Sequence, residues 1–163
     1  MKKKHLLGFL FMAMVIGIGF ASCEKDDGSE GIEFRMRNRD NGDDRISILG
    51  MDSAYHDMYG YYGTDVALGI SVSNNFYVSS WRSNCSITCV GSVSNIRRIN
   101  RIPESGWANE VSVKPGNGYV IRHKNMNELC HYARVYVEDW IESTSGGIIG
   151  AVIRYQDDWI IEE

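Results

Sequence analysis

The sequence lacks the short motifs that mark common classes of enzyme. It contains no zinc-protease helix motif, no nucleophile elbow and no glycine-rich phosphate-binding loop. It also lacks a helical hydrophobic stripe long enough to cross a sheet. These absences make a hydrolase the least favoured of the functions considered for this chain, and the sequence predicts no cofactor.

Positive charge is scarce beyond residue 22. The chain holds 17 Lys and Arg against 21 Asp and Glu, and residues 1–22 contain three of the lysines and none of the acids. The other 141 residues therefore carry 14 basic and 21 acidic side chains, a net charge of −7. This balance argues against binding to nucleic acid and against direct adhesion to anionic lipid headgroups. The length suits one domain.

The apolar run at residues 6–20 is short for a membrane span. At about 1.5 Å per residue, a helix of this run falls short of the roughly 30 Å hydrocarbon core. Three lysines precede it and small residues follow it, which is typical of a signal peptide. The alternative is an uncleaved anchor helix, which the closing cysteine disfavours.

Residues 20–23, with the sequence Phe-Ala-Ser-Cys, resemble the bacterial lipobox, although Phe20 replaces the usual leucine. The resemblance implies that Cys23 becomes the acylated N-terminus and that residues 1–22 are a cleaved lipoprotein signal peptide. More than one acyl chain gives stable anchoring, so we expect attachment to the membrane through the lipid.

Residues 23–30 form an acidic, flexible tether in this interpretation. Lys25 followed by Asp26 and Asp27 resembles the surface-export signal of Bacteroidetes lipoproteins. The resemblance implies a lipid-anchored protein of the outer membrane, exposed at the cell surface. The alternative is a solvated acidic linker with no role in export.

Cysteine is also scarce, with four in the chain. If Cys23 carries lipid, the remaining three allow at most one intramolecular disulfide. On an extended strand Cys85 and Cys89 lie roughly 13 Å apart, too far to bridge. We therefore expect a disulfide between Cys130 and either Cys85 or Cys89. Three reduced, buried cysteines are an equally favoured alternative.

Alternation of apolar and polar residues predicts a series of short strands beyond residue 31. We expect residues 31–163 to form an all-β domain, a single antiparallel β-sandwich or barrel-like fold of about nine short strands. The predicted strands lie at residues 32–37, 46–48, 65–73, 76–78, 87–90, 96–102, 110–114, 119–122, 132–138 and 148–155.

Two turns carry the residues expected of hairpins. Asn41-Gly42 predicts a hairpin from the first strand to residues 46–48. Residues 115–118, Pro-Gly-Asn-Gly, predict the clearest hairpin of the chain. The acids of residues 40–44 offer oxygen ligands for calcium, but their spacing is not that of an EF-hand loop, so we expect a plain turn.

Aromatic residues provide the main signal for a ligand. Tyr59, Tyr61 and Tyr62 lie in an irregular segment, and Trp81 follows a predicted strand. Exposed aromatic rings stack on the apolar faces of sugars, so these four residues are candidates for binding a glycan or another polymer. The alternative is that they fill the core, as we expect for Trp107.

A partner protein offers a different interpretation. The outward residues of the strand at 65–73, namely Ala67, Gly69 and Ser71, form a small and smooth face. A second sheet or another envelope protein could pack on it. The second candidate function is therefore a structural or interaction subunit that docks on an envelope protein through this face.

Other chemistry is less favoured. Residues 52–54, Asp-Ser-Ala, resemble the Bacteroidetes O-glycosylation pattern, which makes Ser53 a candidate acceptor. A cysteine–histidine nucleophile pair could form across strands, such as Cys85 with His123, but histidines at the surface or rim are the preferred interpretation. No pair has the spacing of metal ligands, so we expect no metal site.

Four segments of the chain are distinctive: GWANEV at 106–111, PGNGYV at 115–120, YARVYV at 132–137 and TSGGIIGA at 144–151. Together they resemble a family of uncharacterised lipoproteins from gut Bacteroidetes that carry a domain of unknown function. The resemblance covers roughly residue 70 onward and implies a surface or periplasmic lipoprotein, with no established catalytic residues.

Overall fold

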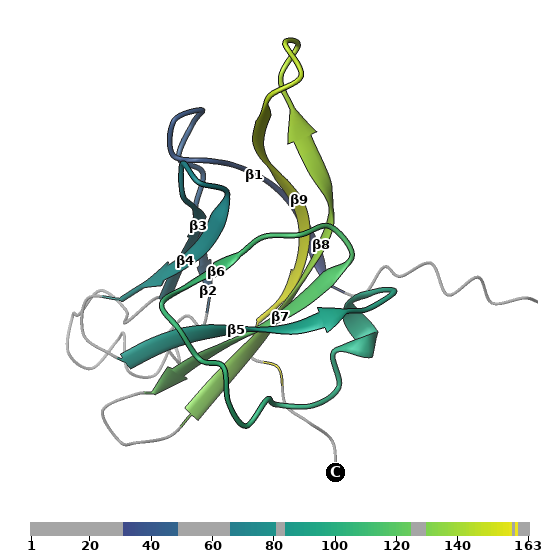
Figure 1. Cartoon of the computed structure of the whole chain (residues 1–163). Coiled ribbons are helices and arrows are strands. Elements are labelled where there is room, and N and C mark those ends of the chain that lie inside the picture. The colour runs from purple at the N-terminus through teal and green to yellow at the C-terminus, as the bar shows by residue number, and fades with distance from the viewer. Residues whose placement is uncertain (1–30, 49–65, 81–83, 125–129, 158, 160–163) are drawn as a thin grey trace, which may run out of the picture.

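The computed structural model describes residues 31–48, 66–80, 84–124, 130–157 and 159 (Figure 1). In these residues the chain forms nine strands in two antiparallel sheets, with one 3₁₀ turn and no α-helix. The larger sheet has the order β1 (Ile32–Arg37), β9 (Ile148–Gln156), β8 (Cys130–Glu142), β7 (Asn117–Lys124) and β5 (Asn84–Ser92). The smaller sheet has the order β2 (Ile46–Ile48), β3 (Val66–Ile70), β4 (Asn75–Ser79) and β6 (Glu110–Ser112). The predicted all-β fold is confirmed, as a sandwich-like pair of sheets rather than a closed barrel.

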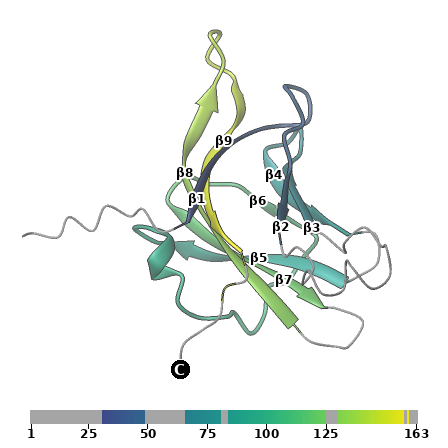
Figure 2. The same cartoon turned by 180° about the vertical axis from the view of Figure 1, so that it is seen from behind.

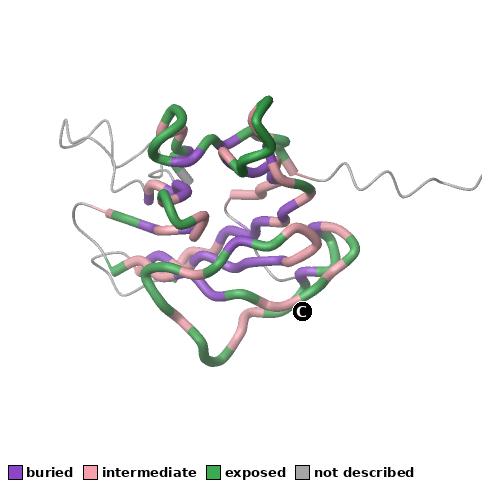
Figure 3. Tube along the Cα trace, turned by 45° about the horizontal axis from the view of Figure 1, so that its top comes forward, coloured by how far each residue is buried: buried purple, intermediate pink, exposed green. Residues whose placement is uncertain are grey.

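The main core lies between the two sheets. Alternate residues of each strand point inward, and Figure 3 shows the buried positions gathered in the strands, with the exposed ones mostly in turns. Phe76 of β4 meets Tyr119 of β7 edge to face, with ring centroids 5.0 Å apart. The residues that alternation predicts to point inward are buried in this core where they lie within β3 and β8, although Val72, beyond the end of β3, is exposed. The buried ones are Val66, Leu68, Ile70, Ala133, Val135 and Val137.

Tyr119 also ties the two sheets through its hydroxyl group. The hydroxyl donates to the carbonyl of Ser112 at 2.8 Å and accepts from the backbone N–H of Lys114 at 2.9 Å. Burial is the main reason that the pKa of Tyr119 rises to about 12. The ring thus holds the segment that crosses from β6 to β7.

Both predicted hairpins are wrong in the same way. β1 pairs with β9 and β2 pairs with β3, so residues 41–42 lie in a corner between sheets. Similarly, β6 pairs with β4, whereas β7 pairs with β5 and β8. Turn residues favour a reversal of the chain, but the strand that each arm pairs with depends on distant residues.

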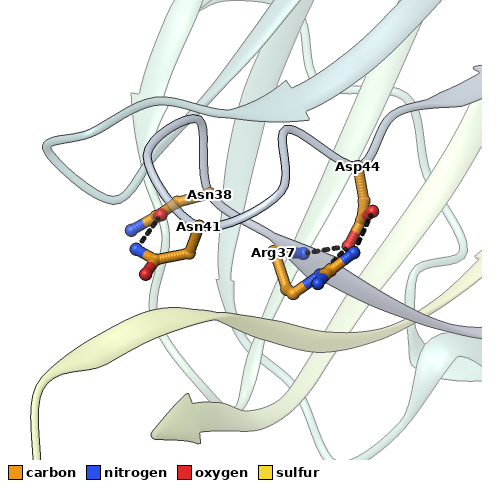
Figure 4. A network of polar contacts seen from close by, with 4 residues as sticks. All are labelled: Arg37, Asn38, Asn41 and Asp44. Carbon is orange, nitrogen blue, oxygen red and sulfur yellow. Dashed lines mark hydrogen bonds and ion pairs between the residues drawn. The ribbon is translucent and has the colours of Figure 1, made fainter. Parts of the chain in front are cut away.

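Side chains close the corner between β1 and β2 (Figure 4). The guanidinium of Arg37 donates to both carboxylate oxygens of Asp44, at 2.7 and 3.0 Å. The Asn41 amide donates to Asn38 Oδ1 at 2.6 Å. Asp43 in turn pairs with Arg45 at 2.6 Å. Two of the three acids of this turn, Asp43 and Asp44, are therefore held by arginines, and the hydrogen bond from Arg37 is the main cause that lowers the pKa of Asp44.

The strand predicted at residues 96–102 is also wrong. This segment begins with the 3₁₀ turn η1 (Ile96–Arg98), and Ile96 and Ile99 are fully buried. Residues three apart lie on the same face of a 3₁₀ turn, whereas on a strand they would point to opposite faces. They pack with Val120 and Trp159 in a second core on the outer face of the larger sheet.

Trp107 borders this second core, as the sequence predicts. Arg122 stacks on the Trp107 ring, with its guanidinium carbon 4.3 Å from the ring centroid. This stacking keeps a long cationic side chain against an apolar surface.

The small residues of β3 do not form a bare face. A Cβ added at Gly69 would lie 2.5 Å from the hydroxyl oxygen of Tyr77, because the side chain of Tyr77 on β4 covers this glycine. Ala67 and Ser71 are half-buried, and Val72, predicted to point inward, is 53% exposed beyond the end of β3. The docking face expected at residues 65–73 is therefore largely occupied by the protein's own tyrosine.

Candidate functional site

A row of one cysteine and two histidines crosses the larger sheet near one end. Cys85 of β5 is the register partner of His123 of β7, and His123 is the register partner of His131 of β8. Residues directly opposite one another on antiparallel strands point to the same face. The pairing of Cys85 with His123 across strands was foreseen as an option from the sequence, and the structure places the two side by side.

The row continues the main core on the inner face of the sheet. Cys85 packs against the core, and His123 shares its side of β7 with the buried residues Tyr119 and Ile121. His123 is only 3% exposed, and its Nε2 atom has no hydrogen-bond partner within the described residues. The centroids of the His123 and His131 rings lie 6.3 Å apart, with the rings tilted by 33°.

Burial sets the charge state of this row. It is the main cause that lowers the pKa of His123, and the charge of His131 lowers it further. Burial also raises the pKa of the Cys85 thiol. At neutral pH the row therefore presents a thiol and an uncharged imidazole at its buried positions.

These charge states bear on the chemistry that the row can perform. A cysteine nucleophile paired with histidine needs a thiolate, with a lowered cysteine pKa, beside an imidazolium. In this row the pKa of Cys85 is raised and the pKa of His123 is lowered, which is the opposite of what a thiolate–imidazolium pair requires. The residues that the structure describes also contain no group of three or more His, Cys, Asp or Glu side chains placed to hold a metal ion. A neutral imidazole can instead donate or accept a hydrogen bond, which suits an uncharged polar ligand.

The predicted disulfide of Cys130 is not formed. Cys85, Cys89 and Cys130 are all free thiols, and Cys89 and Cys130 are exposed. Cys85 and Cys130 lie on strands separated by β7, about two strand spacings of 4.8 Å. The resulting separation exceeds the Cα distance that a disulfide spans. The open alternative of three reduced cysteines fits better, but two of them are exposed rather than buried.

The residues predicted to bind glycan lie outside the described part of the chain, as do Cys23 and the O-glycosylation candidate Ser53. The glycan candidates are Tyr59, Tyr61, Tyr62 and Trp81.

The described strands that flank these segments end together. Ile48 of β2 pairs with Val66 of β3, at the two sides of residues 49–65. At the neighbouring strand ends Asn84 pairs with Lys124, and Lys124 pairs with Cys130. Figures 1 and 2 show these strand ends on the same side of the domain. The Cys85–His123–His131 row lies one residue inside this edge.

Sequence reasoning missed that His123 and His131 come together. Both continue the inward alternation of their strands, Tyr119 and Ile121 on β7 and Ala133 and Val135 on β8. Pairing these two alternating runs as one hairpin would have placed the histidines opposite each other. The predicted hairpin at residues 115–118 instead paired the strand at 119–122 with the strand at 110–114, so the pairing with the strand at 132–138 was not considered.

No family model, curated protein or solved structure matched the chain. Within the described residues, no helix has the length and apolarity needed to span a membrane.

Proposed function

We propose that this chain is a lipid-anchored protein of the outer membrane, exposed at the cell surface, whose β-sandwich binds a glycan or another polymer. The leader at residues 1–22, the cysteine at position 23 and the acidic segment after it support the attachment. The resemblance to gut Bacteroidetes lipoproteins supports the same location.

The arrangement of strand ends carries the binding half of the proposal. The segments that hold Tyr59, Tyr61, Tyr62 and Trp81 both leave and rejoin the sheets at the end of the sandwich that bears the His123 row. Loops gathered at one end of a rigid sandwich are a common place for binding sites. Aromatic faces for stacking suit the apolar faces of a sugar.

Affinity electrophoresis through gels that contain single polysaccharides tests the binding. We expect retardation of the protein in at least one gel, and a loss of most of it in Trp81→Ala and Tyr61→Ala. Val72→Ala and Ile148→Ala serve as matched controls, because they remove exposed apolar side chains elsewhere. Equal retardation of all four variants, or none on any polysaccharide, would contradict the proposal.

The lipid attachment has a separate test. Cys23→Ala should release the protein from the membrane fraction, since the acyl chains supply the anchoring. Retention of an uncut Cys23→Ala chain in the membrane would show that residues 6–20 act as an anchor helix instead.

A further inference from the structure

Three exposed arginines lie close together around η1 although the net charge of residues 23–163 is negative. Arg97, Arg98 and Arg101 are all exposed, in and just after η1. Between them Ile96 and Ile99 are fully buried, and Ile102 packs against the same core. We call the exposed side of residues 96–102, with its three arginines, the η1 surface.

The η1 surface is firmly held by the domain. Nη1 of the buried Arg134 donates to the carbonyl of Ile99 at 3.0 Å, while Nε donates to Gln156 Oε1 at 2.7 Å. On the other side of η1, the N–H of Val93 donates to the carbonyl of Gly116 at 2.9 Å. Buried isoleucines and backbone hydrogen bonds thus present the arginines from a fixed support.

The same surface lies where the tether enters the domain. Gly31 directly precedes β1, and a Cβ added there would lie 3.1 Å from Cδ1 of Ile96. Figures 1 and 2 both show η1 beside this end of β1. Seven residues lie between Cys23 and Gly31, and the eight steps from one Cα to the next span at most about 28 Å in a fully extended chain, which limits the distance of the domain from an acylated Cys23.

We propose that the η1 surface docks on the anionic phosphate headgroups of the membrane to which the protein is tethered. This inference rests on the proposed lipid attachment. Basic residues beside an anchoring segment are attracted to an anionic leaflet within about a Debye length, and a tether of at most about 28 Å lets η1 come within that range. The net charge of −7 gave no sign of such contact, because it averages over a surface whose basic residues are unevenly placed.

Docking through η1 also orients the domain. β5 begins at the end that carries Cys85 and finishes just before η1. Nine strand residues at about 3.3 Å each span roughly 30 Å. With η1 against the headgroups, the His123 end of the sandwich faces away from the membrane, where a polymer has access to it.

Two acidic features compete for the same arginines. Glu104 is exposed three residues beyond Arg101. Residues 24–30 of the tether contain four acids and one lysine. An experiment must therefore distinguish docking on lipid from two other outcomes. These are binding of the chain's own tether and binding of a soluble anionic polymer.

Hydrogen exchange distinguishes these outcomes when it is measured on the purified full-length lipoprotein reconstituted on vesicles. Vesicles of phosphatidylcholine alone are compared with vesicles that contain 40% phosphatidylglycerol, about the content of a strongly anionic leaflet. On the anionic vesicles we expect amides of residues 93–102 to exchange roughly fivefold more slowly, because headgroup contact disfavours local opening of this segment. The slowing should disappear in 0.5 M salt, at which the Debye length is only about 4 Å.

Charge-matched variants assign the effect to the η1 surface. Replacing Arg97, Arg98 and Arg101 by Gln should remove the slowing. Replacing the exposed residues Arg35, Arg39 and Lys114 by Gln makes the same change in net charge outside η1 and should preserve it.

Four results would overturn the inference. The first is equal exchange on both kinds of vesicle, and the second is equal behaviour of the two triple variants. The third is slowing by soluble dextran sulfate without any slowing by anionic vesicles, which would point to a polymer ligand. Faster exchange of the Arg→Gln variant than of the wild type on neutral vesicles, together with no response of the wild type to anionic lipid, would assign η1 to the tether and also overturn the inference. Failure of the protein to float with neutral vesicles would instead refute the lipid attachment.

Discussion

Gly150 of β9 lies opposite Arg37 of β1 at a separation that leaves no room for a side chain. A Cβ added at Gly150 would lie 2.2 Å from the carbonyl oxygen of Met36 and 2.7 Å from Cα of Arg37. These are backbone atoms, so a new side chain could be accommodated only by moving a strand. β1 is the strand that carries the tether, and its attachment to the sheet depends on this contact.

Gly150→Ala should therefore lower the free energy of unfolding by about 2–3 kcal/mol, as overpacking against backbone does. Urea denaturation of the mature protein measures this change. Gly147→Ala is the control, because a Cβ at Gly147 would lie 3.5 Å from Ser143 Oγ, an ordinary van der Waals contact. If the two variants unfold at the same urea concentration, the close approach of β1 and β9 is incorrect.

The buried imidazole of His123 predicts a loss of stability in mild acid. Its pKa is lowered in the folded protein, mainly by burial and also by His131, so the unfolded chain binds the proton more tightly. Stability should be complete above the unfolded pKa of about 6.5 and should fall as the pH drops from there toward the folded pKa.

Urea midpoints at pH 7.5 and pH 5.5 test this dependence. His123→Gln cannot titrate, so its midpoint should fall less between the two pH values than that of the wild type. An identical fall in both proteins would show that His123 does not contribute to the dependence on pH.

The four cysteines predict a specific count of reactive thiols. In the proposed lipoprotein acylation would block Cys23, whereas Cys85, Cys89 and Cys130 are free thiols. Under denaturing but non-reducing conditions, a thiol reagent should therefore modify three groups in the mature protein. One group would indicate a disulfide, and four would indicate that Cys23 carries no lipid.

In the folded protein the same reagent should distinguish the three thiols by rate. Cys89 and Cys130 are exposed, whereas Cys85 is half-buried and burial raises its pKa. Because the thiolate is the reactive form, Cys85 should react at least about tenfold more slowly at neutral pH. Peptide mapping after short labelling identifies each site, and fast labelling of Cys85 would contradict the placement of the row.

Arg134 should be the most important arginine for the stability of the second core. It is buried, donates to Ile99 and Gln156, and lies 5.4 Å from the centroid of the Trp159 ring. Arg134→Met should cost about 2–3 kcal/mol, since it leaves buried acceptors without a charged donor. Arg98→Met, at an exposed position beside it in the fold, should change stability by less than about 0.5 kcal/mol. Similar losses in both variants would contradict the anchoring role of Arg134.

Much of the strand pattern was accessible from the sequence. Alternation correctly placed the buried residues within β3 and β8, and nearly all predicted strands are strands of the structure. The errors fell where pairing is non-local. The turns at residues 41–42 and 115–118 reverse the chain as predicted, but they carry it between sheets, and the isoleucines of residues 96–102 serve η1 instead of a strand.

The candidate site shows the same division. The sequence marked Cys85 and His123 as a pair that could meet, because both residue types were visible in it. Their register, the addition of His131 and the burial that keeps His123 uncharged depend on how β5, β7 and β8 align. The same division holds for charge. The net charge of −7 follows from composition, but the position of the three arginines beside Gly31 does not.

The sequence by itself determined the strand-forming class of this protein, the predicted lipid address at Cys23 and the acidity of the domain. These depend on composition and on residues close together in the chain, where periodicity and motif are sufficient. Only the tertiary structure decided which sheet each strand joins, that the three downstream cysteines stay apart, and that η1 lies against Gly31. Such choices are made by burial between segments far apart in sequence, whose energies no local pattern contains.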